Sequence, residues 1–549
     1  MDQSRKTYIK NSLFMLLFFD FLISVFAPLE FYITNKAYFF FSGIELIPFA
    51  ILLFLAVLIA GAIIIFLLSK TDLKISTPLT CTVTGIVFAL YIIGNFMVVD
   101  YGAMDGLIPR WERFQKEGIL QTAVFIVIPL VSLILSLIIK NKKKVLKAYG
   151  GLSVCLLLVL ILTLVSILIT TGLKKDPEYI VTADHEFELS KDQNVIVFII
   201  DTYDSKIFDD MLLEDYDKYA DLLKDFTYYP DTTSMFAATE LALPQIITGV
   251  SYHNEAPYGE YLKKAFSDSK MLEYLRENDY STGIYTCCRM PQDEMALQFE
   301  NVRYMERTVS SHRRLAGYMY KFLGFRYMPQ PLKEYFWFYP DEMRSELEST
   351  KDDSVEVFYD NNYLFDSKID EMNDLHEGKV FRLYHIDGVH APFSISSDFT
   401  PSSTETSIEE EGRGIMYVVD HLLSLLKEKD IYDNSAIVIM ADHGYFDERS
   451  NPLMLIKGIG EDHPFVVSDK MLSYEYLQDV MMSLCESNTS LEAVKQDESE
   501  QAGRKYLYYA WNKDLKDYAY ASTITEFDVK GNARDIDGYK KIREYHGKE

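Results

Sequence analysis

The apolar run at residues 436–441 stops abruptly on Asp442-His443-Gly444. The run is too short for a buried helix and too apolar for a surface loop, so it predicts a fully buried strand of a parallel sheet. Open α/β sheets place their ligands beyond the carboxyl ends of such strands. An aspartate beside a histidine, with a glycine that lets the chain turn, is a compact pair of metal ligands. The alternative is a strand end that is only hydrogen-bonded.

Two other strand ends and one loop offer further polar groups. The apolar strand predicted from Asn194 ends on Asp201, and the strand predicted at 379–386 is followed closely by His390. A separate segment contributes the hydroxyl of Thr239. Each residue also has a simpler interpretation, with Asp201 and Thr239 as helix N-caps and His390 as a histidine that braces a loop.

The chemistry of this set follows from its ligand types. Asp201, Asp442, His443 and the Thr239 oxygen make a mostly oxygen-rich shell, which favours one divalent ion, Mn²⁺ or Mg²⁺, with Zn²⁺ as the alternative. Coordination favours the alkoxide of a threonine, and the same ion neutralises phosphoryl oxygens in a transition state. We therefore expect attack by Thr239 on phosphorus through a phosphothreonine, with His390 binding substrate or protonating the leaving group.

The elements around these residues predict an α/β domain. Apolar strands alternate with helical patterns such as 205–225 and 413–428, which indicates a mainly parallel sheet over residues 193–480. A polar stretch at 176–192 precedes it and is interpreted as a linker. Residues 481–549 are less patterned and are expected to form the C-terminal part of the same domain, as a small antiparallel addition.

The first 175 residues are of a different kind. They contain five apolar stretches, each close to the roughly 20 residues that a helix needs to cross a bilayer. We therefore predict a transmembrane anchor of five helices. The stretches lie at about 11–34, 46–69, 77–99, 119–139 and 149–173.

The distribution of lysine and arginine predicts the orientation of this anchor. Positive charge is concentrated at the N-terminus and in the second and fourth loops, which we therefore place in the cytoplasm. Five crossings then put everything after residue 175 outside the cell, in a bacterial-type cell membrane. The cations concerned are Arg5, Lys6, Lys10, Lys70, Lys74, Lys140, Lys142, Lys143, Lys144 and Lys147.

Charge separates the two parts as well. Residues 1–175 carry a balance of +7 and the remainder −34. A domain that acidic does not suit nucleic acid, and it implies that an anionic substrate is held by a local cationic site such as a metal. The five cysteines form neither a disulfide framework nor a structural zinc motif.

Four motifs in order carry a family resemblance. They are Asp201 at the end of the first strand, Thr239 five residues before Pro244, the segment Gly388-Val-His390-Ala-Pro-Phe393, and Asp442-His443-Gly444. With five preceding membrane helices, the chain resembles the alkaline phosphatase/sulfatase superfamily. Within it, the chain is most similar to membrane-anchored lipoteichoic acid synthases and phosphoethanolamine transferases. The resemblance implies Thr239 as nucleophile and metal ligand, Asp201, Asp442 and His443 as further ligands, and His390 in substrate binding.

Three departures from the superfamily patterns refine the expectation. Sulfatases oxidise a cysteine or serine to formylglycine, and the segment after Thr239 has neither, which disfavours sulfate ester hydrolysis. After Gly444, His463 is the histidine on offer for a second metal, so one ion is expected. Asp201 also stands where lipoteichoic acid synthases have a glutamate, which suggests a divergent subgroup.

Three functions follow for testing. The first is a metal-dependent phosphotransferase that moves a phosphoglycerol- or phosphoethanolamine-type head group from a membrane phospholipid to a cell-surface glycan or glycolipid. The second is a membrane-tethered phosphodiesterase or phosphatase that uses the same site. The third is a non-catalytic relative that binds lipid or a partner enzyme.

Overall fold

The chain divides into two compact units in the computed structural model, which describes residues 3–101, 108–288, 290, 293–352, 354–372, 375–445, 450–494, 503–509 and 519–547. The helical unit comprises Met1–Pro177 and Glu306–Lys351, and the sheet unit comprises Glu178–Met305 and Asp352–Glu549. The expected domain range 193–480 thus includes a segment, Glu306–Lys351, that groups with the helical unit. We call it the return segment.

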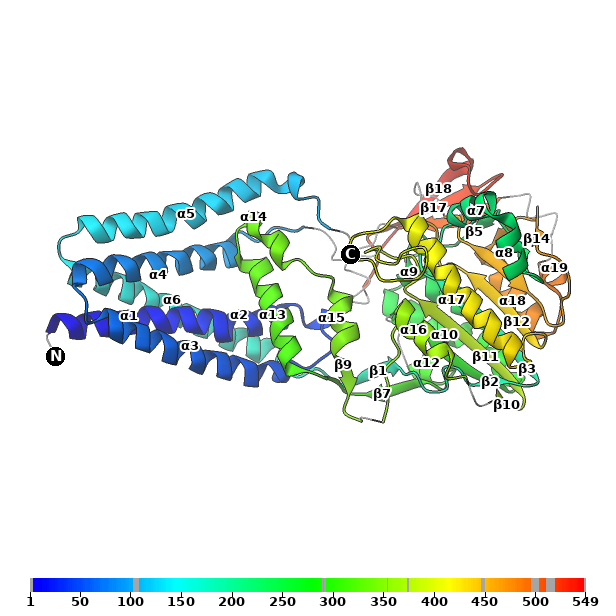
Figure 1. Cartoon of the computed structure of the whole chain (residues 1–549), viewed down its shortest axis with the longest axis horizontal. Coiled ribbons are helices and arrows are strands. Elements are labelled where there is room, and N and C mark those ends of the chain that lie inside the picture. Colours follow the sequence, from blue (N-terminus) through cyan, green and yellow to red (C-terminus); the bar gives the residue numbers. More distant parts are fainter. Residues whose placement is uncertain are drawn as a thin grey trace. The chain divides into compact units, whose positions relative to one another are not determined.

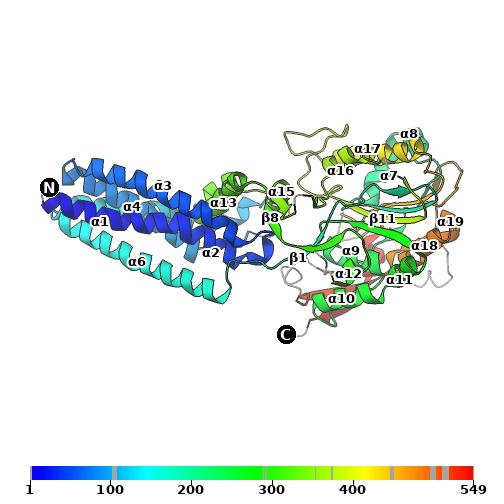
Figure 2. The same ribbon diagram turned by 90° about the horizontal axis from the view of Figure 1, so that it is seen from below.

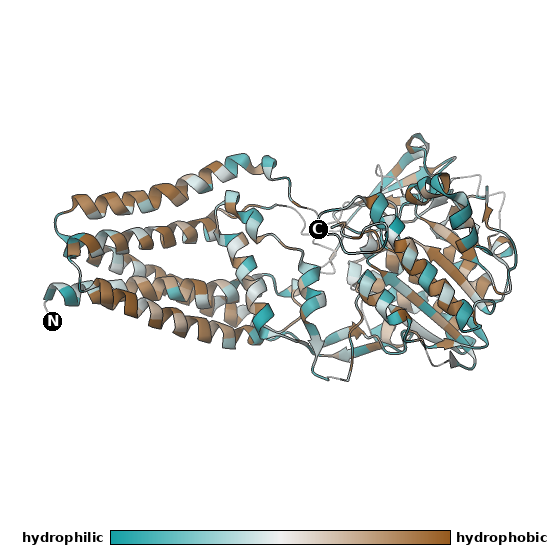
Figure 3. Ribbon diagram, in the orientation of Figure 1, coloured by the Kyte–Doolittle hydropathy of each residue, from teal (hydrophilic) through white to brown (hydrophobic). Residues whose placement is uncertain are grey.

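Five helical spans in the helical unit are long and apolar enough to cross a membrane, as predicted. They are the long, mostly brown helices of Figure 3. Many apolar side chains of the second, fourth and fifth spans are exposed along the bundle, which suits a lipid environment. The first span is α1 (Gln3–Asp20), a π-helical turn η1 (Phe21–Phe26) and α2 (Ala27–Thr34); the others are α3 (Leu46–Leu68), α4 (Leu73–Phe96), α5 (Gln115–Ile138) and α6 (Lys142–Thr170).

The return segment packs against these helices. The apolar side of its longest helix, which includes Tyr318 and Phe322, belongs to the same buried cluster as Phe26 and Tyr32 of the first span. A short antiparallel pair, β8 with β9, closes the segment at its base. The elements are β8 (Arg307–Val309), α13 (His312–Tyr327), α14 (Gln330–Lys333), η5 (Glu334–Phe336), α15 (Pro340–Leu347) and β9 (Glu348–Thr350).

One ion pair fastens α13 to the first span. Arg326 Nη1 lies 2.8 Å from Glu30 Oε2, and Arg326 Nε donates a 3.1 Å hydrogen bond to the carbonyl of Gly94. Both charged side chains are mostly buried. Removing the arginine leaves a mostly buried carboxylate without its cation, so we expect Arg326→Gln to lower the free energy of unfolding by about 2 kcal/mol. Thermal unfolding of the purified full chain measures this.

A double-mutant cycle separates the ion pair from the packing of the arginine stem. The variant carrying both Glu30→Gln and Arg326→Gln should lose less stability than the sum of the two single variants. Additive losses would show that Arg326 acts through packing alone.

The sheet unit is built on a seven-stranded sheet in the order β14-β4-β13-β12-β3-β11-β6. Strands β12, β3, β11 and β6 run parallel, and β13 pairs with β12 in the antiparallel direction. The mainly parallel sheet is therefore confirmed. The strands are β3 (Gln193–Ile200), β4 (Thr227–Tyr228), β6 (Tyr280–Tyr285), β11 (Lys379–Ile386), β12 (Ser435–Met440), β13 (Met454–Lys457) and β14 (Val466–Val467).

Helices cover both faces of this sheet, which explains why its central strands are mostly apolar. Along β3, Val197 and Ile199 enter one core, and Ile196 and Phe198 enter the other. The two layers are visible in Figures 1 and 2. The first core contains residues of α9 (Thr239–Thr248), α10 (Tyr258–Asp268), α11 (Lys270–Glu277) and α18 (Leu477–Cys485); the second contains residues of α7 (Ser205–Glu214), α8 (Tyr216–Leu222), α16 (Asn362–Ile369) and α17 (Ile408–Glu428).

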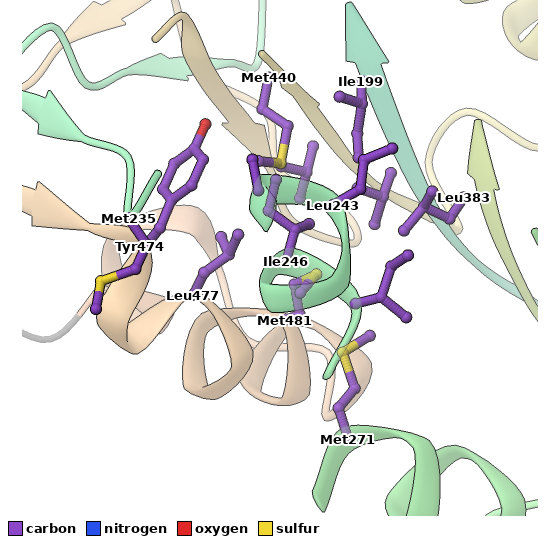
Figure 4. Packing of buried hydrophobic residues seen from close by; sticks show 14 of the residues in the cluster. Ile199, Met235, Leu243, Ile246, Met271, Leu383, Met440, Tyr474, Leu477 and Met481 are labelled. Carbon is purple, nitrogen blue, oxygen red and sulfur yellow. The ribbon is translucent and has the colours of Figure 1, made fainter. Parts of the chain in front are cut away.

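Packing fixes the position of α9 under the sheet. Leu243 and Ile246 of this helix lie between strand residues such as Met440 and the α18 residues Leu477 and Met481, as Figure 4 shows. All of them are fully buried. The start of α9, and with it Thr239, is therefore held close to the carboxyl ends of the strands.

The C-terminal region adds the expected antiparallel piece, a three-stranded sheet in the order β16-β17-β18. Small elements complete the sheet unit. These strands and elements are β16 (Arg504–Tyr508), β17 (Thr523–Val529), β18 (Tyr539–His546), β1 (Glu178–Val181), β2 (Leu189–Ser190), β5 (Thr232–Thr233), β7 (Val302–Met305), β10 (Leu375–His376), β15 (Leu472–Ser473), α12 (Asp293–Ala296) and α19 (Ser490–Ala493).

Candidate active site

Adjacent parallel strands bring the predicted acids together. Asp201 follows β3, and Asp442 and His443 follow the neighbouring strand β12, so all three lie at the carboxyl edge of the sheet. The ligand atoms of these three residues lie within 4.8 Å of one another. Among the described residues they form the one such group of three or more histidine, cysteine or acidic side chains.

Thr239 joins this group from the start of α9. Its Oγ1 lies 3.4 Å from Asp201 Oδ2 and 3.4 Å from His443 Nε2. His443 Nε2 in turn lies 3.8 Å from Asp201 Oδ1 and 3.5 Å from Asp442 Oδ2. The four residues that the sequence predicts as ligands therefore converge on one point.

The two oxygens of Asp442 have different environments. Oδ1 accepts hydrogen bonds from the backbone N–H groups of Thr202, at 3.1 Å, and His443, at 2.9 Å. Oδ2 is fully buried and has no hydrogen-bond partner among the described residues. A buried carboxylate oxygen without a donor is costly unless a cation compensates it. Asp442 is thus oriented by one oxygen and offers the other to the centre of the site.

His443 is oriented in the same way. Its Nδ1 lies 2.8 Å from the carbonyl oxygen of Gly444, so the ring carries its proton there and presents Nε2 to Thr239 and the acids. A histidine whose second nitrogen is held by a carbonyl is the usual arrangement of a metal ligand. Burial alone would lower the pKa of His443, but the carboxylates of Asp442 and Asp201 raise it.

The conformation of α9 explains the spacing between Thr239 and Pro244. The helix begins at Thr239, and Ala238 is its N-cap, so Thr239 is the first helical residue rather than the cap. Pro244 lacks the N–H that would bond the Glu240 carbonyl one turn earlier. The hydroxyl of Tyr258 donates a hydrogen bond to that carbonyl. Because Thr239 is the first residue of α9, its hydroxyl lies at the positive end of the helix dipole, which favours an anion there.

Two glycines are required for the close approach of the loops. Gly388 has a φ of 62°, and a Cβ there would lie 2.4 Å from the backbone nitrogen of Asp201. At Gly444 a Cβ would lie 2.8 Å from the backbone nitrogen of Asn451. Both motif glycines therefore let neighbouring chain segments pack directly against the ligand residues.

His390 and His385 add positive charge beside Asp201. Burial alone would lower the pKa of His390, but Asp201 and Asp387 raise it to about 9. His385 is buried, with Nε2 3.5 Å from Asp201 Oδ2 and Nδ1 3.3 Å from Thr286 Oγ1. Burial raises the pKa of Asp201, whereas the hydrogen bond from His385 and the charges of the three histidines bring it well below its usual value.

No motif in the sequence marks His385 as a site residue. It is the seventh of eight residues in a buried strand, where alternation predicts a core side chain. Its proximity to Asp201 comes from the pairing of β11 with β3, in which His385 lies opposite Ile199. The strand register is the signal that could have identified His385, because it places this residue one position before the end of β11, at the same sheet edge as Asp201.

The residues present fit a divalent cation. Asp201, Asp442 and His443, with the Thr239 oxygen, supply three oxygen donors and one imidazole nitrogen, and the partnerless Oδ2 of Asp442 is the kind of buried atom that a cation satisfies. His463, the candidate for a second ion, is held instead by Glu461 Oε1, 3.3 Å from its Nε2, and by the Pro464 carbonyl.

A buried acid next to the His390 loop gives a pH-dependent stability. Glu411 Oε2 accepts hydrogen bonds from the backbone N–H groups of Ser394, at 2.6 Å, and Ile395, at 3.0 Å. Burial nevertheless raises the pKa of Glu411 from 4.5 to about 7. The folded state thus binds this proton more tightly than the unfolded state, and stability falls as the pH rises from about 4.5 to about 7.

We expect Glu411→Gln to remove this dependence. Between pH 5 and pH 8 the variant should lose about 2 kcal/mol less unfolding free energy than the wild type. Urea unfolding of both proteins at the two pH values measures the difference. An identical pH dependence in the two proteins would mean that Glu411 stays ionised in the folded state throughout.

Comparisons with known proteins agree with this architecture. The sulfatase family model matches residues 193–472. Similar solved structures include a phosphonate monoester hydrolase from Silicibacter pomeroyi, 12% identical over 64% of this chain and 88% of that chain, with a TM-score of 0.37. A protein in the alkaline phosphatase superfamily from Vibrio parahaemolyticus is 11% identical over 66% and 84%, with a TM-score of 0.35.

A sulfatase from Pseudoalteromonas sp. is also similar, at 12% identity over 64% of this chain and 82% of that chain, with a TM-score of 0.34. Among the curated proteins, none matches the chain. The family model spans about half of the sequence and includes every ligand residue described above. The chain therefore belongs to the sulfatase family, and residues 193–472 form an enzyme domain of that family.

Proposed function

We propose that this protein is a membrane-anchored, metal-dependent phosphotransferase that moves a phospholipid head group to a cell-surface glycan or glycolipid. The observation that carries the proposal is the position of Thr239. Its Oγ1 lies 3.4 Å from both Asp201 Oδ2 and His443 Nε2, at the first residue of α9. A hydroxyl among metal ligands, at the positive end of a helix dipole, suits attack on a phosphoryl group.

The reaction proceeds in two displacements. Thr239 Oγ1 forms a bond to phosphorus, and the bond from phosphorus to the diacylglycerol oxygen breaks, which leaves the head-group phosphate on Thr239. The hydroxyl proton passes to water, because the depressed pKa of Asp201 makes that carboxylate a poor base. An acceptor hydroxyl then attacks the same phosphorus, the bond to Thr239 breaks, and the threonine regains a proton.

His390 is the proton donor for the leaving group in this reaction. With a pKa raised to about 9, its imidazole is protonated at neutral pH and has a proton to give to the diacylglycerol oxygen. The acceptor hydroxyl returns a proton in the second displacement. A divalent cation held by Asp201, Asp442 and His443 supplies Lewis acidity that favours the Thr239 alkoxide and offsets phosphoryl charge.

The membrane helices support a lipid donor. Five apolar spans indicate membrane insertion, which keeps the enzyme domain near phospholipid head groups. The excess of lysine and arginine in the even-numbered loops supports a cytoplasmic N-terminus and an enzyme domain outside the cell. The motif order resembles that of lipoteichoic acid synthases and phosphoethanolamine transferases, which supports a phosphoglycerol or phosphoethanolamine head group and Mn²⁺ or Mg²⁺ as the metal.

Hydrolysis is the second candidate, because the same first displacement followed by attack of water releases the head group. Membership of the sulfatase family, which includes hydrolases, favours this alternative. Sulfate esters remain disfavoured as substrates, since a threonine side chain cannot be oxidised to the aldehyde of formylglycine.

The test uses the full chain in vesicles of dioleoylphosphatidylglycerol or dioleoylphosphatidylethanolamine, with Mn²⁺ and with or without a diglucosyl lipid acceptor. We expect diacylglycerol release, a head-group phosphate on Thr239 by peptide mass spectrometry, and head group on the glycolipid. Release to water alone, with no labelled glycolipid, would establish the hydrolase. Absence of any adduct and any diacylglycerol would exclude both enzymes and leave a lipid- or partner-binding relative.

A further inference from the structure

The return segment reaches the ends of the membrane helices rather than their middles. Arg326 contacts Glu30 in the last turns of the first span and the carbonyl of Gly94 near the end of α4. The backbone N–H of Gln330 donates a 2.9 Å hydrogen bond to Gln121 Oε1, two turns into α5. Successive spans alternate in direction, so the end of one and the start of the next lie at the same bundle end.

This is also the end from which the chain continues into the sheet unit. The carbonyl of Leu173, just beyond α6, accepts a 2.9 Å hydrogen bond from Gly43 before α3. His312 at the start of α13 lies 2.8 Å from Glu45 in the same loop. Figure 1 shows α13 crossing the direction of the long helices. When the five spans cross a bilayer, α13 therefore lies along the head-group layer at the end of the bundle where the chain leaves α6.

The two sides of α13 differ sharply in composition. One side buries Leu315, Met319 and Phe322 in the cluster that it shares with the membrane helices. The helix carries four cations and no acid, whereas residues beyond 175 as a whole carry a strong negative balance. The alternating teal and brown of α13 in Figure 3 contrasts with the uniformly apolar spans.

The outward side combines cations with tyrosines. We call it the return face, and it consists of Arg313, Arg314, Tyr320, Lys321 and Tyr335. Tyr320 is 66% exposed and Tyr335 is 74% exposed. Lys321 Nζ lies 5.5 Å from the centre of the Tyr318 ring, which holds its stem along the helix surface. Exposed tyrosines beside basic side chains are typical of segments in the membrane–water interface.

We propose that the return face binds the head groups of anionic phospholipids in the leaflet at this end of the membrane helices. The contacts of Arg326 and Gln330 hold the helix at this end of the bundle, where its exposed cations meet the phosphates of the surrounding lipids. Arg314 also lies 3.8 Å from Glu346 Oε2, in an exposed pair that a lipid phosphate can replace. Binding is independent of the chemistry at Thr239.

The test compares two triple variants of the full chain in a neutral detergent. The first is Arg313→Gln/Arg314→Gln/Lys321→Gln on the return face. The matched control is Lys263→Gln/Lys264→Gln/Lys270→Gln, three exposed cations of α10 and α11 in the sheet unit. Each protein is titrated with dioleoylphosphatidylglycerol or with dioleoylphosphatidylcholine, and the unfolding midpoint is followed, because a ligand of the folded state raises it.

Phosphatidylglycerol should raise the midpoint of the wild type and the control more than phosphatidylcholine does. The return-face variant should bind phosphatidylglycerol at least about tenfold more weakly, since each cation near an anionic surface contributes several-fold to affinity. Soluble glycerophosphate should give no shift, which separates a lipid from a free phosphate ester. Equal responses of the return-face variant and the control would overturn the proposal.

A second measurement tests the proposal even if the return-face variant does not fold. Trp337 follows η5 within the return segment. The substitutions Trp111→Phe and Trp511→Phe leave it as the only tryptophan of the sequence. Phosphatidylglycerol brominated near the head group should quench its fluorescence in vesicles, and no quenching would place the return segment away from the bilayer. Thr239→Ala should leave both results unchanged, so loss of enzymatic activity and loss of lipid binding are distinguishable.

Discussion

Thr239→Ala should abolish head-group transfer and diacylglycerol release, with a loss of about a thousandfold or more in kcat/KM. The hydroxyl is the nucleophile that lies among the candidate ligand atoms, with Oγ1 3.4 Å from Asp201 Oδ2 and from His443 Nε2. The fold should persist, because Thr239 begins α9 without capping it and the helix is held by buried Leu243 and Ile246. Lipid-phosphate turnover in vesicles and the mass of the Thr239 peptide measure the result.

Thr239→Ser is the matched control for this prediction. It keeps a hydroxyl at the same position and should retain the covalent adduct, now on serine, with activity reduced by about tenfold or less. The lost methyl group frees the rotamers of the nucleophile, and this explains the decrease. If the alanine variant still turned over phospholipid at the wild-type rate, the covalent mechanism would be wrong.

The grouping of the candidate ligand residues was predictable because strand ends are visible in a sequence. The apolar runs before Asp201 and Asp442 are bounded abruptly by acids, and their fully buried character predicts parallel neighbours in the sheet. The two strands do pair in parallel, with Met440 opposite Ile199. When both runs are neighbouring parallel strands, their carboxyl ends lie at the same edge of the sheet, and the two acids that follow them come close together.

The return segment was not predictable from the same patterns. Residues 312–327 form an amphipathic helix with four cations, which resembles any surface helix of a soluble domain. Its partners, Glu30 and Gly94, are more than two hundred positions away, and neither carries a motif. Contact with the membrane helices depends on tertiary packing, for which one sequence supplies no period or spacing.

The role of Pro244 also needed the structure. The sequence shows only its spacing from Thr239. In the structure, the proline leaves the Glu240 carbonyl without its usual helical N–H donor, and the hydroxyl of Tyr258 donates to that carbonyl instead. Tyr258 belongs to the next helix and has no sequence signature of its own. The same holds for His385, whose place beside Asp201 depends on strand register.

Asp442→Asn should remove the metal and the activity while it preserves the fold. Oδ1 of Asp442 accepts two backbone hydrogen bonds, and an asparagine oxygen in that position keeps both. The amide nitrogen would then replace Oδ2, which is fully buried and has no partner among the described residues. The change therefore puts a neutral donor where the site needs an anionic ligand.

Metal-dependent stability is the sharpest measurement of this prediction. The unfolding midpoint of the wild type should fall with EDTA and recover with Mn²⁺, whereas the midpoint of Asp442→Asn should respond to neither. Asp442→Ala is the contrasting variant, because it also leaves the backbone N–H groups of Thr202 and His443 without an acceptor. Each lost hydrogen bond should lower the free energy of unfolding by about 1–3 kcal/mol. An Asp442→Asn protein that bound Mn²⁺ with wild-type affinity would refute the assignment of Oδ2 as a ligand and move the cation away from this strand end.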